Sequence, residues 1–283
     1  MSFRVFAYHA FVGFCLIIMH SCVSNRKDLP DTYIQKARAA IELRQYQTAK
    51  NYIDSIRIVF PKDYVKIREG LQVMREIEFA EQKRTREYCD SLLNVRQSQF
   101  PEKQKNFSFQ RNKAYESVGY YVNNHQLHKN NYNRTFLQTK VDEKGRLIVT
   151  SYYSGPRKIN HTRLRIYSSD GLFVETQDVP RDGALNYAFK DGDINYEIVR
   201  FNEKKLNGLI NFILLNNGGT LKVELIGDVN RTYNMRKEDK DALKAACELA
   251  AVLSDITRLL EEIRLAQAKM DYIRSKQLSR AED

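Results

Sequence analysis

Residues 136–153 read FLQTKVDEKGRLIVTSYY, and this stretch decides the fold class. Two runs rich in β-branched and aromatic residues, 136–141 and 146–153, flank the polar turn sequence DEKG at residues 142–145. Strand-forming runs on either side of a glycine-containing turn are typical of an antiparallel hairpin. The centre of the chain is therefore predicted to be an antiparallel sheet.

The same alternation of short runs and turn residues continues after this hairpin. Further candidate strands are residues 163–167, 172–176, 185–189, 196–201, 208–215 and 221–226. Turn sequences that contain glycine separate several of them, at residues 169–171, 190–193 and 216–219. About eight short strands with no helix between them predict a β-sandwich or a small barrel, which we assign to residues 107–234.

Long helices are predicted on both sides of the strands. Residues 64–97 contain no proline and repeat apolar residues every three or four positions, which predicts one amphipathic helix that ends at Phe100-Pro101. Residues 236–279 contain neither glycine nor proline, and a four-three spacing places five apolar residues on one stripe: Leu249, Leu253, Ile256, Leu260 and Ile263. The predicted class is α+β, with a helical segment at residues 30–101, the antiparallel β domain and a long C-terminal helix.

The sequence leaves open what the C-terminal helix packs against. Its stripe can meet the helix at residues 64–97 of the same chain or of another subunit. We expect an antiparallel pair within the chain, because the apolar stripes of two helices of similar length would otherwise be left exposed to water. Cys89 and Cys247 lie in these two helices and either form one disulfide or are two small buried hydrophobic residues.

The start of the helical segment resembles one unit of the tetratricopeptide repeat, on the residues Tyr33, Ala37, Tyr46, Ala49, Ile53, Ile56 and Pro61. The resemblance implies two antiparallel helices that approach closely at the alanines. It places Arg44-Gln45 at the turn, where this family prefers glycine. Ala40 stands where the family has an aromatic residue, and no second unit follows in register. A plain helix pair is the alternative.

The first 22 residues predict export and a lipid anchor. Arg4 precedes an apolar run at residues 11–19, which is too short to cross the roughly 30 Å hydrocarbon core of a bilayer as a helix. Ser21-Cys22 follows, and the arrangement resembles the lipobox of bacterial lipoproteins, in which the cysteine thiol takes a diacylglycerol and becomes the new N-terminus. The resemblance implies a signal peptide at residues 1–21, lipidation of Cys22 and a linker at residues 22–29. His20 departs from the lipobox pattern, and an uncleaved anchor or an ordinary secretory signal is the alternative.

Charge and the residue after Cys22 bear on partners and location. Lys and Arg number 46 against 35 Asp and Glu, for a formal net charge of +11. These basic residues are spread along the chain, which favours a solvated basic surface, and we expect no nucleic-acid partner. Val23 is not the aspartate that retains many lipoproteins in the inner membrane. The predicted location is the outer membrane, facing the periplasm or the surface.

No residue pattern predicts catalysis, a metal ion or a cofactor. His125 and His128 have no third ligand nearby in the sequence, and His161, alone near a strand, is expected to be a surface or hydrogen-bonded histidine. Asp191-Gly192-Asp193 is interpreted as a turn, because the other positions of a Ca²⁺ loop are missing. The sequence contains no G-x-S-x-G nucleophile motif. We expect that the protein is not an enzyme.

Tyrosine is abundant, with 17 residues, and tryptophan is absent. In a strand, the neighbouring tyrosines of Tyr120-Tyr121 and Tyr152-Tyr153 point to opposite faces. One of each pair is expected in the core and the other on the surface, which predicts scattered stacking platforms for sugar or peptide.

As a whole, the chain resembles envelope lipoproteins of Gram-negative bacteria. The resemblance implies a membrane-anchored, non-enzymatic protein that binds or scaffolds a protein or glycan, and it carries over no active site. Two other functions stay open: a cell-envelope hydrolase whose site forms only in the fold, and a structural protein that self-associates through its C-terminal helix. The ligand and the oligomeric state are not predicted.

Overall fold

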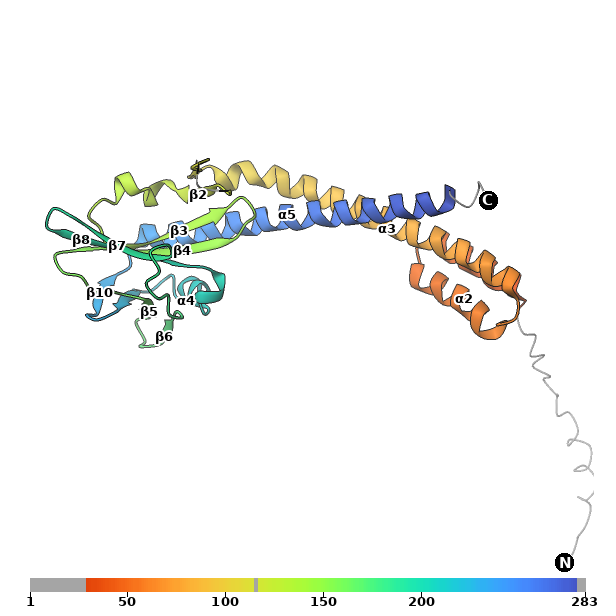
Figure 1. Ribbon diagram of the computed structural model, residues 1–283, viewed down its shortest axis with the longest axis horizontal. Helices are drawn as coiled ribbons and strands as arrows, with labels where there is room; N and C mark the ends of the chain where they lie inside the picture. The colour runs from red at the N-terminus through yellow and green to blue at the C-terminus, as the bar shows by residue number, and fades with distance from the viewer. Residues whose placement is uncertain (1–28, 115–116, 279–283) are drawn as a thin grey trace, which may run out of the picture. The chain divides into compact units, whose positions relative to one another are not determined.

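The computed structural model describes residues 29–114 and 117–278, and it confirms the α+β class (Figure 1). The chain forms two compact units, one up to Glu81 and the other from Gln82 onward, and each is described by itself. Within the described residues, no helix has the length and apolar character needed to span a membrane. Cys22 and the predicted signal peptide lie outside the described residues.

The first unit is helical. α1 (Pro30–Glu42) and α2 (Tyr46–Val59) form the expected helical hairpin, and the beginning of α3 (Tyr64–Gln104) shares its apolar core. Ala37 and Ala49 are fully buried in this core, because small side chains let two helices approach closely. The resemblance to a tetratricopeptide unit stays a prediction.

The turn between α1 and α2 contains a strained residue. Arg44 has a φ of 58°, in the left-handed region that glycine adopts at little cost and other L-residues do not. This turn is the place where the tetratricopeptide family prefers glycine. Here Arg44 adopts the left-handed conformation instead.

The predicted end of the long helix at Phe100-Pro101 is wrong. α3 continues through Pro101 to Gln104. A proline inside a helix removes one backbone hydrogen bond and crowds the preceding turn. Because only three residues of α3 follow Pro101, the loss is confined to the last turn of the helix.

Six strands form the larger sheet of the second unit, and all neighbouring strands are antiparallel. The predicted hairpin at residues 136–153 is present, and it pairs Phe136 with Tyr152 and Val141 with Leu147. In spatial order the strands are β1 (Phe107–Gln110), β2 (Tyr120–Asn123), β3 (Phe136–Asp142), β4 (Leu147–Gly155), β8 (Ile194–Phe201) and β7 (Asn186–Asp191).

Four strands form a second antiparallel sheet, in the order β10 (Arg231–Asn234), β9 (Lys222–Ile226), β5 (Arg163–Tyr167) and β6 (Phe173–Glu175). Side chains of both sheets meet in one core, which confirms the sandwich-like arrangement. The larger sheet contributes Leu137, Val149, Val199 and Phe201, and the smaller one contributes Leu164, Ile166, Val223 and Leu225.

The strand predicted at residues 208–215 is wrong, because this run forms helix α4 (Leu209–Leu215), which follows the 3₁₀ turn η3 (Glu203–Lys205). Apart from Asn211, residues 209–215 are apolar, and such a run without alternation fits a buried strand and a buried helix equally well. Leu206, Leu209 and Ile213 recur at helical intervals and are buried in the core of the sandwich. Packing on that core therefore decides between the two structures.

A glutamine side chain takes the place of a strand beside the first part of β3. β2 pairs with β3 only at residues 140–142. Earlier in β3, Gln126 at the end of η1 (Asn124–Gln126) donates from Nε2 to the Leu137 carbonyl at 2.9 Å. Its Oε1 accepts from the Thr139 N–H, also at 2.9 Å. One side-chain amide thus makes both kinds of bond that a neighbouring strand makes.

The helix α5 (Lys237–Leu278) runs antiparallel to the part of α3 that belongs to the second unit, as expected (Figure 1). Lys103 Nζ lies 2.8 Å from Glu248, and Arg96 Nε lies 2.8 Å from Asp255. Residue numbers thus fall along one helix as they rise along the other. Apolar contact between the two helices involves Cys89, Leu92, Leu93, Ile256, Leu259 and Ile263.

One position of the predicted α5 stripe is wrong. Leu260 is 49% exposed, whereas Leu259 is 1% exposed and packs against α3. The residues that face the core here, Leu253, the partly buried Ile256 and Leu259, contain two successive steps of three. A straight helix drifts by about 20° per heptad from a strict four-three repeat, and the contact moves to the neighbouring leucine.

The two described cysteines are free. Cys89 Sγ lies 3.2 Å from a carboxylate oxygen of Glu262. Glu262 is 15 residues along α5 from Cys247, or about 22 Å at 1.5 Å per residue, which is too far for a disulfide. Of the two alternatives for the cysteines, the structure supports small hydrophobic residues, because Cys89 is buried and Cys247 packs on the sandwich core.

The hairpin between β3 and β4 approaches α5 through its glycine. Gly145 has a φ of 82°, and a Cβ at this position would lie 2.3 Å from the Ser254 nitrogen and 2.6 Å from the Ala250 carbonyl oxygen. Any other residue would push the hairpin away from the helix. The glycine in the turn sequence therefore fixes the distance between the sheet and α5.

Candidate functional site: the outer face of the six-stranded sheet

The two faces of the larger sheet have different surroundings. Its inner face packs against the smaller sheet and against α5, through residues such as Val199 and Val141. The segment between β2 and β3 partly covers the other face, which we call the outer face: Phe136, Gln138 and Thr150 are only 1–3% exposed there, and Gln138 donates to the Gln126 carbonyl. The strand registers place one row of apolar side chains across it: Phe136, Tyr152, Ile198 and Tyr187.

Aromatic rings on the outer face form two stacked pairs. The rings of Phe136 and Tyr152 lie 5.1 Å apart with planes 11° from parallel. Those of Phe189 and Tyr196 lie 4.9 Å apart at 12°. Each pair joins residues that are directly opposite on adjacent strands, where side chains interact most strongly. The pairs fix the orientation of the rings, and Phe189 is still 47% exposed.

The segment between β2 and β3 brings two further rings to this face. Tyr132 lies 6.1 Å from the Tyr196 ring and donates a 2.9 Å hydrogen bond to Asp191. The nearby Tyr196 hydroxyl and the Asp191 carboxylate raise the pKa of Tyr132 to about 12. His128, which begins η2 (His128–Asn130), lies 5.9 Å from Tyr132 and 6.4 Å from Tyr152. A loop thus extends the aromatic surface of the strands.

A polar row lies beside the aromatic row. Thr150 of β4 is opposite Gln138 on β3 and opposite Arg200 on β8. Gln138 donates to the Gln126 carbonyl at 2.6 Å and accepts from the Tyr152 hydroxyl at 3.3 Å. Thr150 is 1% exposed, and its hydroxyl has no hydrogen-bond partner among the described residues. Arg200 is exposed, and no carboxylate of the described chain forms an ion pair with it.

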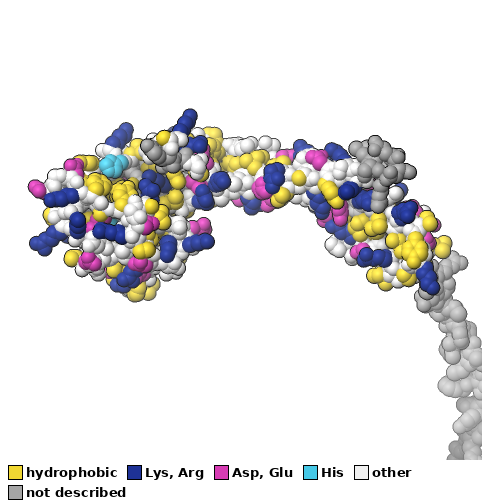
Figure 2. Space-filling model, viewed as in Figure 1, with side chains coloured by type: hydrophobic (Ala, Val, Ile, Leu, Met, Phe, Trp, Pro, Cys, Tyr) yellow, Lys and Arg dark blue, Asp and Glu magenta, His cyan; other side chains and the backbone are white. Residues whose placement is uncertain are grey.

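Figure 2 shows hydrophobic side chains gathered next to an exposed histidine on the β domain, with Lys and Arg side chains around them. Rings with both a flat apolar face and a polar edge suit ligands that are part apolar and part hydrophilic. The outer face therefore has the composition of a recognition surface.

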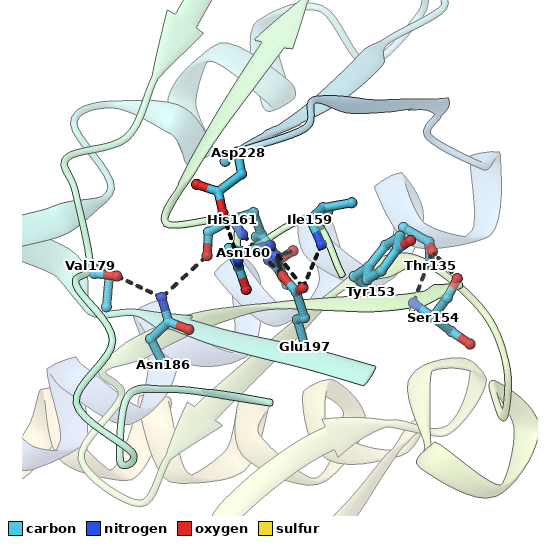
Figure 3. A network of polar contacts seen from close by, with 12 residues as sticks. Thr135, Tyr153, Ser154, Ile159, Asn160, His161, Val179, Asn186, Glu197 and Asp228 are labelled. Carbon is cyan, nitrogen blue, oxygen red and sulfur yellow. Dashed lines mark hydrogen bonds and ion pairs between the residues drawn. The ribbon is translucent and has the colours of Figure 1, made fainter. Parts of the chain in front are cut away.

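A second polar constellation lies on the inner side of the sheet and is buried (Figure 3). His161 Nδ1 lies 2.8 Å from Glu197 Oε2, and His161 Nε2 lies 3.1 Å from Ser151 Oγ. Because a carboxylate only accepts hydrogen bonds, Nδ1 carries a proton. The order serine, histidine, carboxylate is that of a nucleophilic relay. Ser151 is 0% exposed, however, so no substrate reaches its hydroxyl in this structure.

The main contacts of Glu197 are with backbone. Its carboxylate accepts hydrogen bonds from the backbone N–H groups of Ile159, Asn160 and His161 at 2.8, 2.8 and 3.0 Å. Burial raises the pKa of Glu197, but the bonds from the His161 side chain and these N–H groups outweigh it and lower the pKa to about 2. Asn186 adds bonds to the carbonyls of His161 and Val179 (Figure 3). The network holds the segment before β5 against the sheet.

The predicted candidates for chemistry stay apart from one another. His125 and His128 are exposed on successive 3₁₀ turns, and within the described residues no group of His, Cys, Asp and Glu could hold a metal ion. Asp191-Gly192-Asp193 lies in the β7–β8 hairpin, as the turn interpretation predicts. His161 is hydrogen-bonded, one of the two expected states.

The tyrosine prediction is right in one respect and wrong in another. Tyr153 is buried, as expected, and Tyr152 lies on the opposite face. Tyr152 is half-buried and not exposed, however, and Tyr120 and Tyr121 are both half-buried. The platforms are gathered and not scattered, because β8 and β7 bring Tyr196 and Phe189 to the side of the sheet that carries Tyr152. Alternation in each strand could have assigned the faces, but only the strand order brings the rings together.

Comparisons with known proteins return no relative: no family model, curated protein or solved structure matches the chain. The fold and the outer face therefore define the class of this protein. It is an α+β protein with a sandwich-like β domain, one sheet of which presents an aromatic face.

Proposed function

We propose that the protein is a membrane-anchored envelope lipoprotein and a non-enzymatic binding module, with the outer face of the larger sheet as its recognition surface. The observation that carries this proposal is the meeting of aromatic side chains from β3, β4, β8, β7 and a loop on one face, where Phe189 and Tyr132 are 47% and 57% exposed. Exposed, preoriented aromatic rings are enriched at binding surfaces because they bury a large area at a small entropic cost.

The burial of Ser151 and His161 favours binding over hydrolysis. A nucleophile needs access to the reacting atom, and the two side chains are 0% and 1% exposed. Their hydrogen bonds help to order the segment before β5. The packing of the α5 stripe against α3 of the same chain favours binding over self-association through this helix.

The anchor is tested by expressing the full-length protein and Cys22→Ala in a Gram-negative host with an alkyne-tagged fatty acid. We expect lipid labelling and outer-membrane fractionation for the parent chain, and neither for the variant. Label on both chains, or unlabelled soluble protein in both cases, would contradict the lipoprotein part of the proposal.

The recognition surface is tested by photocrosslinking in intact cells. A photoreactive phenylalanine analogue replaces Phe189 on the outer face or, as the matched control, Phe173 on β6, which is 58% exposed against 47% for Phe189. We expect a discrete crosslinked product from position 189 alone. Equal products from both positions, or none from position 189, would show that the outer face binds no envelope component.

A further inference from the structure

The larger sheet ends in a strand that offers backbone groups for further pairing. β7 is the last strand on one side of this sheet. With six residues it is the longest of the four edge strands, against four, four and three for β1, β10 and β6. An edge strand presents a row of N–H and C=O groups with which another strand can pair. Phe189 in the middle of β7 is 47% exposed, so this edge is accessible.

The register of the β7–β8 hairpin shows which groups of β7 point outward. Asp191 and Ile194 flank a two-residue turn, and the Arg200 N–H donates to the Leu185 carbonyl at 2.8 Å. The odd-numbered residues of β7 therefore exchange hydrogen bonds with β8. The even-numbered residues direct their backbone groups away from β8.

The even-numbered residues differ in whether their outward groups are occupied. The Asn186 N–H donates to Asp182 Oδ1 at 3.0 Å, and the Asn186 carbonyl accepts from the N–H groups of Asp182 and Gly183. Among the described residues, none forms a hydrogen bond with the outward backbone groups of Ala188 and Lys190. The middle of the edge therefore offers one N–H and one C=O from each of these two residues.

These groups are self-complementary in one antiparallel register. When a second β7 lies beside the first with Phe189 opposite its own copy, Ala188 of each chain is opposite Lys190 of the other. Every free N–H then meets a free C=O, and all of these groups are satisfied. With the centre moved to Ala188, Lys190 meets the occupied Asn186. With the centre moved to Lys190, Ala188 meets the turn residue Gly192, so each of these two registers loses half of the bonds.

The same register suits the side chains. Phe189 and its copy form a pair without mutual hydrogen bonds, whose Cα atoms lie about 4.5 Å apart and whose side chains are in contact. Each Phe189 ring already stacks on Tyr196 of its own chain at 4.9 Å, so the aromatic row continues across the junction. On the opposite face, the exposed Lys190 lies beside the small Ala188 and stays in solvent. An unrelated extended peptide could use the backbone groups, but a second copy always brings a matching ring to the centre.

We propose that two copies of the chain pair antiparallel through β7, about a two-fold axis at Phe189, and thereby join their larger sheets into one continuous sheet. The contact uses the edge of the sheet and not its outer face. It therefore presents two copies of the aromatic surface side by side. This inference goes beyond the proposed function, because it concerns a different surface and does not depend on what the outer face binds.

Disulfide formation tests the register in the full-length protein, purified in a mild detergent. Phe189→Cys is expected to give a disulfide-linked dimer under mild oxidation, because Cα atoms about 4.5 Å apart lie within the range of a disulfide. Leu185→Cys, on the same edge and 43% exposed, is the register control. Its distance from the centre places the two copies of position 185 about 27 Å apart. Phe173→Cys on β6, at an exposed position, is the control for random contact. We expect no dimer from either control or from the parent chain with its own cysteines.

Sedimentation analysis tests the same contact with the Phe189 ring in place. Ala188→Pro removes an N–H that points away from β8, a position at which an edge strand tolerates proline. Ala188→Ser keeps the N–H and is the matched control. We expect the parent chain and Ala188→Ser to dimerise, and Ala188→Pro to raise the dissociation constant of the dimer at least tenfold. The melting temperature of the dilute, monomeric protein is expected to be the same for all three chains.

Several outcomes would overturn the inference. A parent chain that stays monomeric up to about 100 μM would show that the edge does not pair with itself. Equal disulfide yields from positions 189 and 185, or none from position 189, would show that the register is wrong. Dimerisation of Ala188→Pro as tight as that of the parent would place the contact elsewhere. In each case a photocrosslink from position 189 to a different envelope component would still support the binding function, so the two failures are distinguishable.

Discussion

Replacing Glu197 by glutamine tests whether the buried network stabilises the β domain. The carboxylate accepts three backbone N–H bonds of 2.8–3.0 Å and the bond from His161, and its pKa falls from the ordinary 4.5 to about 2. One pKa unit corresponds to about 1.4 kcal/mol, so ionisation of Glu197 favours the folded state by about 3 kcal/mol at neutral pH. Glutamine cannot ionise, and its NH₂ group would face donors.

The sign of the pH dependence follows from the lowered pKa. The stabilisation is fully present above pH 4.5 and is lost as the pH falls toward 2, because protonation then favours the unfolded chain. We expect urea unfolding at pH 7 to show Glu197→Gln less stable than the parent by about 3 kcal/mol, and the difference to shrink in acid. The exposed Glu203→Gln serves as the control and is expected to change neither value. A difference below about 1 kcal/mol, or one that stays constant down to pH 2.5, would refute the reasoning.

Three further predictions concern the scaffold. Arg44→Gly is expected to slow hydrogen exchange in the α1–α2 hairpin by stabilising it by about 1 kcal/mol, because the residue has a φ of 58°; faster exchange would contradict this. Gly145→Ala is expected to destabilise the β domain by at least about 2 kcal/mol in urea unfolding, since its Cβ would overlap the backbone of α5, and an unchanged midpoint would show that the hairpin can move. Cys89 and Cys247 are expected to react with iodoacetamide at pH 8 only after unfolding, because the pKa of both thiols is raised, mainly by burial. Rapid modification of these two cysteines in the native protein would contradict this.

The α+β class and most strands follow from local patterns, and the exceptions have physical reasons. The hairpin at residues 136–153 is predictable because its turn sequence and its strand-forming runs agree. Residues 208–215 are not, because a short, mostly apolar run without alternation has the same appearance in a strand and in a buried helix. β1, β2 and β10 have four residues each, which is too few to show a clear alternation in the sequence. Their extended structure depends on pairing with the strands beside them.

The candidate site is less predictable than the fold, because it depends on which strands are neighbours. Alternation assigns Tyr152 and Tyr153 to opposite faces from the sequence alone. The meeting of Tyr152 with Ile198 and Tyr187 needs the order β4, β8, β7, in which the third strand precedes the second along the chain. The buried contact of Ser151, His161 and Glu197 likewise joins three separate segments of the chain, and no spacing in the sequence predicts it.

The Gln126 amide beside β3 has a consequence for how the β domain behaves when many copies are present. A seventh strand in that place would offer its own outer row of N–H and C=O groups, and the edge would only move outward. The Gln126 amide directs one donor group and one acceptor at β3, and it offers no repeating row of backbone N–H and C=O groups with which another chain could pair. Gln126 thus ends the hydrogen-bonding array at the point where an incoming chain could otherwise extend it, and it protects this stretch of β3 from intermolecular strand pairing.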